Sequence, residues 1–323
     1  MSAFKSSKML LGAMALATAF SAPVLAQQKS VAITAIVEHP ALDAVRDGVK
    51  DQLAEAGFEA GKNLKWQYQS AQGNTGTAAQ IARKFVGDRV DVIVAIATPS
   101  AQAVAAATRD IPLVFSAVTD PVVAKLVASS EASGTNISGV SDALELDKQI
   151  DLIKRIVPNA TRVGMVFNPG EANSVVVVEQ MRKLLPEHGM SLVEAAAPRS
   201  VDVGSAARSL IGKVDVFYTS TDNNVVSAYE SLVKVGSDAK IPLVAADTGS
   251  VARGAVAAYG MDYYALGKQT GAMVVRILNG EQPGAMPFET SNILELHVNP
   301  KAAQSQGVSL SAELLESAGK VLD

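Results

Sequence analysis

The chain has 323 residues, of which 48% are hydrophobic and 19% charged, and its net charge is −4 at pH 7. This length can bury one large core or two ordinary ones. The acidic balance, with no run of basic residues, argues against a nucleic-acid partner. Cysteine is absent, which excludes a disulfide framework, a thiol nucleophile and a cysteine-bound metal.

Residues 1–26 are expected to form a secretory signal peptide. Lys5 and Lys8 precede an apolar segment from Met9 to Phe20, and small residues precede a cleavage point after Ala26. The apolar segment is shorter than the roughly 20 residues that span a bilayer. Because the chain has no cysteine that a lipid could modify, we expect an exported, soluble, monomeric protein of the periplasm.

The first half of the mature chain alternates apolar runs with helical patterns. The expected strands are 31–37, 64–69, 91–97 and 111–118, and the expected helices between them are 41–56, 77–86 and one that follows Ser100. Gly57 is expected to end the first helix. A strand, a short polar turn and a helix therefore recur through this half.

The second half repeats the plan of the first. Val31 and Gly57 are 26 positions apart, as are Val163 and Gly189. The expected strands are 163–167, 191–196, 214–219 and 241–245, with a helix at 225–235, and the pair VDVI…IPLV recurs as VDVF…IPLV. This repetition indicates a duplication, and the alternation predicts an α/β fold of two Rossmann-like lobes with parallel sheets.

The remaining segments are expected to join the two lobes. Residues 137–142 and 255–262 fall between the halves, and a helix at 263–278 and a strand at 292–298 follow the second unit. The simplest arrangement has the chain cross back between the lobes, so that these last segments complete both of them. The predicted division is an N-terminal lobe of 27–141 with 263–283 and a C-terminal lobe of 142–262 with 284–323.

Motifs of the common enzyme classes are missing from the sequence. It contains no phosphate-binding glycine motif, no GxSxG and no HExxH, and its three histidines lie far apart. We therefore expect no metal, no cofactor and no catalytic role. Paired carboxylates could still serve an exported hydrolase, which stays open as an alternative.

Polar residues instead recur where the predicted strands end. They are Glu38, Thr98, Ser100, Thr119, Asp120, Asn168, Glu171, Asn173, Ser174, Thr221, Asp222, Asn223 and Asp247. Taken alone, each one is better explained by a helix cap or a turn than by contact with a ligand. Their recurrence after almost every strand favours one binding site between the lobes, because ligands of open α/β sheets lie at the carboxyl ends of strands.

The site is expected to hold a small molecule with charged ends. An ammonium group needs a carboxylate once it leaves water, and the candidates are Asp222, Asp247, Glu171 and Glu38. Asp222 is the first choice and Asp247 the second. Helix N-termini at the same loops favour a carboxylate. The side chains predicted to meet that carboxylate are Thr98, Ser100, Thr119, Asn173 and Ser174.

Several segments resemble one known family. They are IVEHPALDAVRDGVKDQLAEAGF (36–58), AIATPSAQAVA (95–105), PLVFSAVTDPV (112–122), NPGEANS (168–174), TDNNVVSAYESLVKVG (221–236) and GMDYYALGKQT (260–270). The sequence is similar, in order and over most of the mature chain, to the ABC-transporter substrate-binding proteins related to the tryptophan/tyrosine-binding protein.

The resemblance implies a type I periplasmic-binding fold, in which three interlobe crossings form a hinge. It also implies uptake of a small solute, with aromatic amino acids favoured, and docking on an ABC permease in the inner membrane. It places the turn that contains Pro40 on the ligand as well. The alternatives are the same fold binding a nucleoside, a sugar or an aromatic carboxylic acid, or serving as a ligand sensor.

Overall fold

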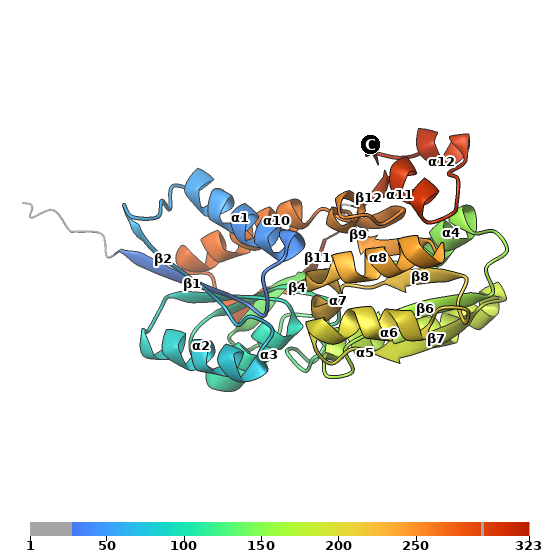
Figure 1. Ribbon diagram of the computed structural model, residues 1–323. Coiled ribbons are helices and arrows are strands. Elements are labelled where there is room, and N and C mark those ends of the chain that lie inside the picture. Colours follow the sequence, from blue (N-terminus) through green and yellow to red (C-terminus); the bar gives the residue numbers. More distant parts are fainter. Residues whose placement is uncertain (1–27, 292–293, 323) are drawn as a thin grey trace, which may run out of the picture.

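The structure is a computed structural model that describes residues 28–291 and 294–322. These residues form two α/β lobes that lie side by side, each with a central sheet between helices (Figure 1). The prediction of two lobes built on parallel sheets is confirmed. The expected signal peptide lies outside the described residues. Within the described ranges, no helix is long and apolar enough to cross a bilayer.

The first lobe is a six-stranded parallel sheet with helices on both faces. Its strands are β1 (Lys29–Ala35), β2 (Leu64–Ser70), β3 (Val92–Ile96), β4 (Leu113–Val118), β5 (Ile137–Ser141) and β11 (Glu289–Thr290), in the order β11-β5-β4-β3-β1-β2. Helices α1 (Pro40–Glu55) and α10 (Tyr263–Leu278) cover one face, and α2 (Thr75–Gly87) and α3 (Thr98–Ala107) cover the other (Figure 1). The central strands are apolar because both of their faces are buried.

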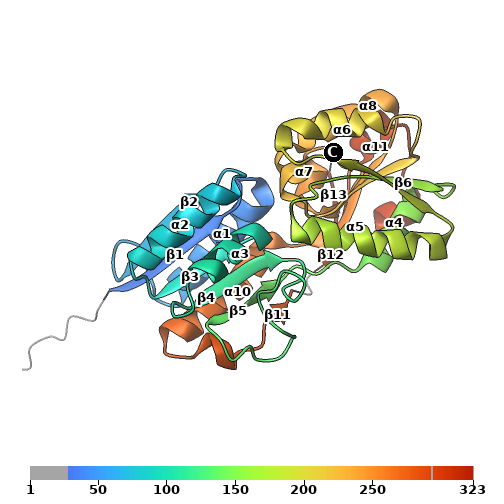
Figure 2. The ribbon, with the colours of Figure 1, turned by 90° about the horizontal axis from the view of Figure 1, so that it is seen from below.

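The second lobe repeats this strand order in seven strands. They are β6 (Arg162–Phe167), β7 (Ser191–Ala196), β8 (Val216–Thr219), β9 (Leu243–Asp247), β10 (Ala257–Met261), β12 (Leu294–Val298) and β13 (Lys320–Val321), in the order β13-β12-β10-β9-β8-β6-β7. Helices α4 (Leu146–Ile156) and α5 (Ala172–Leu184) cover one face, and α6 (Val203–Ser209), α7 (Asn223–Ser227) and α8 (Tyr229–Ala239) cover the other (Figure 2). The short helices α9 (Gly249–Ala252), α11 (Pro300–Ser305) and α12 (Ala312–Glu316) complete this lobe.

The connections between the lobes differ from the prediction in two respects. Residues 137–141 and 257–261, expected as links, are the sheet strands β5 and β10, and the chain leaves each lobe after them. Strand β11 belongs to the first sheet and β12 to the second, so the chain changes lobes a third time. Because β11 pairs with β5, residues 289–290 belong to the first sheet, whereas the predicted division placed them in the C-terminal lobe. Strand β12 also runs antiparallel to β10.

Helix α10 comes late in the sequence but packs on the first lobe against α1. A methyl group added at Gly267 would clash with the carbonyl oxygen of Val45, and one added at Gly48 would clash with that of Tyr264. The two helix backbones are therefore in direct contact, which only glycine allows. This contact fixes the start of α10, where one crossing of the chain enters the first lobe.

Candidate functional site

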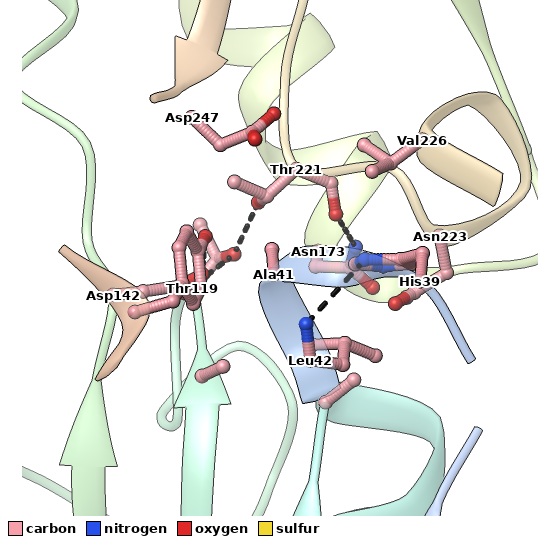
Figure 3. Close-up of a pocket in the computed structure, with 13 residues that line it drawn as sticks. His39, Ala41, Leu42, Thr119, Asp142, Asn173, Thr221, Asn223, Val226 and Asp247 are labelled. Atoms are coloured by element: carbon pink, nitrogen blue, oxygen red, sulfur yellow. Dashed lines mark hydrogen bonds between the residues drawn. The ribbon is translucent and has the colours of Figure 1, made fainter. Parts of the chain in front are cut away.

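Loops from both lobes meet at the carboxyl ends of the strands and enclose a cavity (Figure 3). Its described walls are formed by His39, Ala41, Leu42, Ala97, Ala117, Thr119, Asp142, Asn173, Thr221, Asn223, Val226, Asp247 and Tyr263. The open space between these side chains is only about 20 Å³, little more than one water molecule needs. A larger ligand therefore requires the lobes to part or the side chains to move.

The turn between β1 and α1 brings His39 to the cavity. Its Nδ1 accepts a hydrogen bond from the backbone N–H of Leu42 at 3.4 Å and so caps α1. Burial, with a smaller effect of the Arg253 charge, lowers the pKa of His39 to about 3. The imidazole is therefore neutral and carries its proton on Nε2. Its neighbours Glu38 and Pro40, both predicted to face the ligand, are exposed outside the cavity wall.

The N-terminus of α3 offers neutral hydrogen-bond donors beside the cavity. Ala97, on the wall, holds a left-handed backbone conformation with φ of 72° and gives α3 no side-chain cap. The hydroxyl oxygens of Thr98 and Ser100 are buried and have no hydrogen-bond partner among the described residues. Buried polar groups are seldom left unpaired, and a helix N-terminus attracts an anion. The pair of hydroxyls is therefore suited to a ligand carboxylate.

The loop after β6 forms the opposite wall through a network of buried polar side chains. Glu171 accepts hydrogen bonds from three asparagine side chains, at 3.2 Å from Asn168, 3.3 Å from Asn173 and 2.6 Å from Asn223. Burial and the neighbouring Asp222 carboxylate raise the pKa of Glu171. Its carboxyl group holds Asn173 and Asn223 in position on the wall, while Glu171 itself stays behind it.

Asp222 also lies behind the wall and not on it. Its carboxylate accepts hydrogen bonds from the backbone N–H groups of Asn168 and Val225 and from the hydroxyl of Ser174, at 2.6, 2.9 and 2.6 Å. The side chain is fully buried, caps α7, and has all of these donors from its own lobe. The expectation that Asp222 meets a ligand ammonium is therefore not supported by its position, and Ser174 likewise serves Asp222.

Two other buried acids do face the cavity. Asp142 follows β5 and accepts hydrogen bonds from the hydroxyls of Thr119 at 3.1 Å and Tyr263 at 2.7 Å. Asp247 ends β9 and accepts from the backbone N–H and the hydroxyl of Ser250, at 2.8 and 2.6 Å. Burial raises the pKa of both carboxyl groups.

The wall carries no positive charge to balance these acids. Among the described residues that line the cavity there is no lysine or arginine, and His39 is neutral. One hydrogen bond joins the two lobes here, between the hydroxyl groups of Thr119 and Thr221 at 3.2 Å (Figure 3). The wall thus presents the carboxyl groups of Asp142 and Asp247 and the apolar side chains of Leu42 and Val226, and the hydroxyl groups of Thr98 and Ser100 are buried beside Ala97.

The predicted residues divide into three groups. Those on the wall are Thr119, Asn173, Thr221, Asn223 and Asp247, and those close behind it are Thr98, Ser100, Glu171, Ser174 and Asp222, all buried, and the half-buried Asn168. Those away from it are Glu38, Pro40 and Asp120, the last of which caps the turn that holds Val122 and Val123. Asp142, His39, Tyr263 and the apolar wall were not among the predicted site residues.

Comparison with known proteins identifies the family. The family model described as ABC transporter substrate binding protein matches residues 30–322. The chain belongs to this family. Its members are solute-binding proteins that work with an ABC permease. The two lobes form the type I periplasmic-binding fold, and the predicted resemblance is confirmed.

Three relatives are informative about this substrate-binding protein. The tyrosine-binding protein of Clostridioides difficile is 41% identical over 273 residues, which are 84% of this chain and 79% of that protein. An ABC domain from Streptococcus pneumonia, solved in complex with L-Trp, is 30% identical with a TM-score of 0.88 over 91% of this chain and 100% of that chain. The ligand-free, open structure of a substrate-binding protein with adhesive properties from Clostridium difficile is 41% identical but reaches a TM-score of only 0.68, over 91% of this chain and 99% of that chain.

These scores bear on how the lobes are placed. The open relative has the higher sequence identity, yet the tryptophan-bound relative fits this chain better. Lobes that keep their internal fold but differ in separation produce such a reversal. The arrangement of the lobes here is thus nearer to that of the ligand-bound relative, in agreement with the small cavity and the bond between Thr119 and Thr221.

Proposed function

We propose that this protein is the exported receptor of an ABC importer and that it binds an amino acid, with an aromatic side chain favoured, between its lobes. The observation that carries the proposal is the charge pattern of the cavity. Two buried acids face it, no lysine or arginine lines it in the described chain, and unpaired neutral hydroxyls lie at one helix N-terminus. An α-amino acid supplies the matching groups, an ammonium and a carboxylate.

Each end of an amino acid has a place in this arrangement. The ammonium meets the acids at the hinge, because a buried cation needs a carboxylate partner. The carboxylate meets Thr98, Ser100 and the N-terminus of α3, whose N–H groups and dipole favour an anion. The side chain then contacts Leu42, Val226 and the neutral ring of His39, a surface that suits an aromatic group better than a charged one.

The relatives support the aromatic class. One is named a tyrosine-binding protein and another was solved with L-Trp. The pattern of residues 1–26 supports export to the periplasm, and the absence of cysteine supports a receptor without a lipid anchor. On this proposal the protein acts as a monomer, catalyses no reaction, requires no cofactor, and binds no nucleic acid.

Binding would close the lobes by favouring the closed arrangement over the open one, which only differential affinity can do. The amino acid then contributes contacts to both lobes that the open form does not have. The closed lobes are the form that would dock on the permease.

A thermal-shift screen tests the proposal on protein that has been unfolded and refolded to remove any bound solute. A ligand at 100 times its dissociation constant adds about 2.7 kcal/mol to the free energy of unfolding. L-tyrosine, L-tryptophan and L-phenylalanine are expected to raise the melting temperature by several degrees. Phenylpropionate, which has the ring and carboxylate but no amino group, is the matched control and should not. Stabilisation by sugars or nucleosides alone, or equal stabilisation by phenylpropionate, would refute the proposal.

A further inference from the structure

The cavity holds one acid more than a single amino acid requires. Asp142 and Asp247 both line it, their exposed fractions are 2% and 3%, and no cation lies on the described wall. An amino acid brings one ammonium and also adds a carboxylate. Two ionised acids would leave an unbalanced buried charge, which is strongly unfavourable. One of the two carboxyl groups is therefore expected to be neutral.

The hydrogen-bond partners distinguish the two acids. Both partners of Asp142 are hydroxyl groups, from Thr119 and Tyr263, and a hydroxyl group can accept a hydrogen bond as well as donate one. Asp247 Oδ1 instead accepts from the backbone N–H of Ser250, which can only donate. A protonated Asp142 keeps both of its hydrogen bonds, whereas Asp247 is bonded in the way that suits a carboxylate.

The charged groups around the two acids also favour an ionised Asp247 and a neutral Asp142. The Arg253 guanidinium acts to lower the pKa of Asp247, and no cation has this effect on Asp142. The titratable group in contact with Asp142 is Tyr263 from α10, and the groups that act on Tyr263 in turn are Asp247 at the end of β9 and Tyr218 from β8; none of the three is positive. His39, across the cavity, is neutral.

We propose that Asp247 is the ionised acid that meets the ligand ammonium, and that Asp142 is protonated at neutral pH and acts as a positioning residue at the hinge. This inference rests on the proposed function. A protonated Asp142 donates through Oδ1 to Thr119, whose own proton is then free to bond Thr221 in the second lobe at 3.2 Å.

This line of hydrogen bonds connects three places beside the boundary between the lobes. Asp142 follows β5, where the chain leaves the first lobe, and Tyr263 begins α10, where the chain re-enters it. Thr119 follows β4 and reaches the other lobe through Thr221. The neutral acid thus ties two crossings of the hinge to the interlobe bond without adding a second negative charge to the site.

Two isosteric variants, Asp247→Asn and Asp142→Asn, separate the roles. Titration calorimetry at pH 7 with L-tyrosine and L-tryptophan should show an affinity loss of more than about 30-fold for Asp247→Asn, because the ammonium loses its charged partner. Asp142→Asn presents one donor and one acceptor, as a protonated acid does, so its loss should be at least about 10-fold smaller. Equal losses, or a larger loss for Asp142→Asn, would overturn the proposal.

Infrared difference spectra give a readout that does not need a ligand. At pH 7 one protonated-carboxyl band should disappear in Asp142→Asn and remain in Asp247→Asn, while the band of Glu171, whose pKa is raised to about 7, should remain in both variants. Tyr263→Phe, which keeps the ring and removes one hydroxyl partner of Asp142, should shift that band and provides the test if Asp142→Asn does not fold. Spectra in which Asp142→Asn removes no protonated-carboxyl band, or in which Asp247→Asn removes the same band, refute the assignment. Wild-type protein that binds no amino acid refutes the proposed function and the role of Asp247, and the band then decides the protonation of Asp142 alone.

Discussion

Replacement of His39 by asparagine tests whether water reaches this side chain in the folded protein. His39 caps α1 through Nδ1 and is 8% exposed, and burial lowers its pKa to about 3 from 6.5. Asparagine keeps a side-chain cap for the helix and does not titrate. The variant therefore removes one titrating group from the cavity wall while preserving its main structural role.

The magnitude follows from the two pKa values. As the pH falls below 6.5, the unfolded chain binds a proton at His39 while the folded chain does not, so acid lowers the free energy of unfolding of the wild type. At pH 5 this contribution is about 2 kcal/mol, since each unit between the pH and the unfolded pKa contributes about 1.4 kcal/mol. At pH 7.5 it is close to zero. The buried acids shift stability in the opposite direction, so only the difference between variant and wild type isolates His39.

The assay is urea unfolding at pH 5 and pH 7.5, followed by the fluorescence of Trp66, the single tryptophan of the chain, which lies on β2 in the same lobe. The stability of His39→Asn relative to wild type should rise by about 2 kcal/mol between pH 7.5 and pH 5. Tyr68→Phe is the control, because it removes a hydrogen bond to Glu38 in the same loop but no group that titrates in this range. A relative stability of His39→Asn that is the same at both pH values would show that water reaches the imidazole, and the reasoning would fail.

Three further substitutions test the packing behind the site. Asp222→Ala leaves three buried donors without a partner and should lower the free energy of unfolding, measured in urea, by about 3 kcal/mol. The control Asp120→Ala removes a half-buried turn cap and should lower the free energy of unfolding by about 1 kcal/mol. Gly267→Ala forces α10 away from α1 and should destabilise by more than about 2 kcal/mol, while Gly87→Ala, with open space around it at the end of α2, should not destabilise. Thr221→Val removes the hydrogen bond between Thr119 and Thr221 and should weaken amino-acid binding about 5-fold in titration calorimetry. An unchanged affinity would show that this hydrogen bond does not support closure of the lobes.

The order of strands and helices was predictable because apolar runs and turn residues carry it locally. Helix α10 was predicted at its observed bounds, and the strand before each polar turn was found within a few residues. Strands β5 and β10 were predicted only as links, because the short runs ISGVS and AAYGM contain small and polar residues that resemble a connection. Their pairing with β4 and β9 depends on the sheet around them.

The site was predictable as a set of loops but not as a set of side chains. Asp222 and Asp247 look alike in the sequence, since each lies at a strand end and before a short helix. Only the structure distinguishes them, because the Asp222 side chain is bonded to three donors of its own lobe and the Asp247 side chain faces the cavity. Asp142 and Tyr263 are 121 residues apart, and no local pattern indicates that two crossings of the chain bring them together.

The most direct test of the account is a crystal structure of the refolded protein with L-tyrosine. The account predicts the ligand between the lobes, with its amino group about 3 Å from the Asp247 carboxylate and its carboxylate at the same distance from Thr98 and Ser100. An amino group bonded to Asp222, a carboxylate turned toward the hinge, or a cleft that stays empty at saturating tyrosine would contradict it.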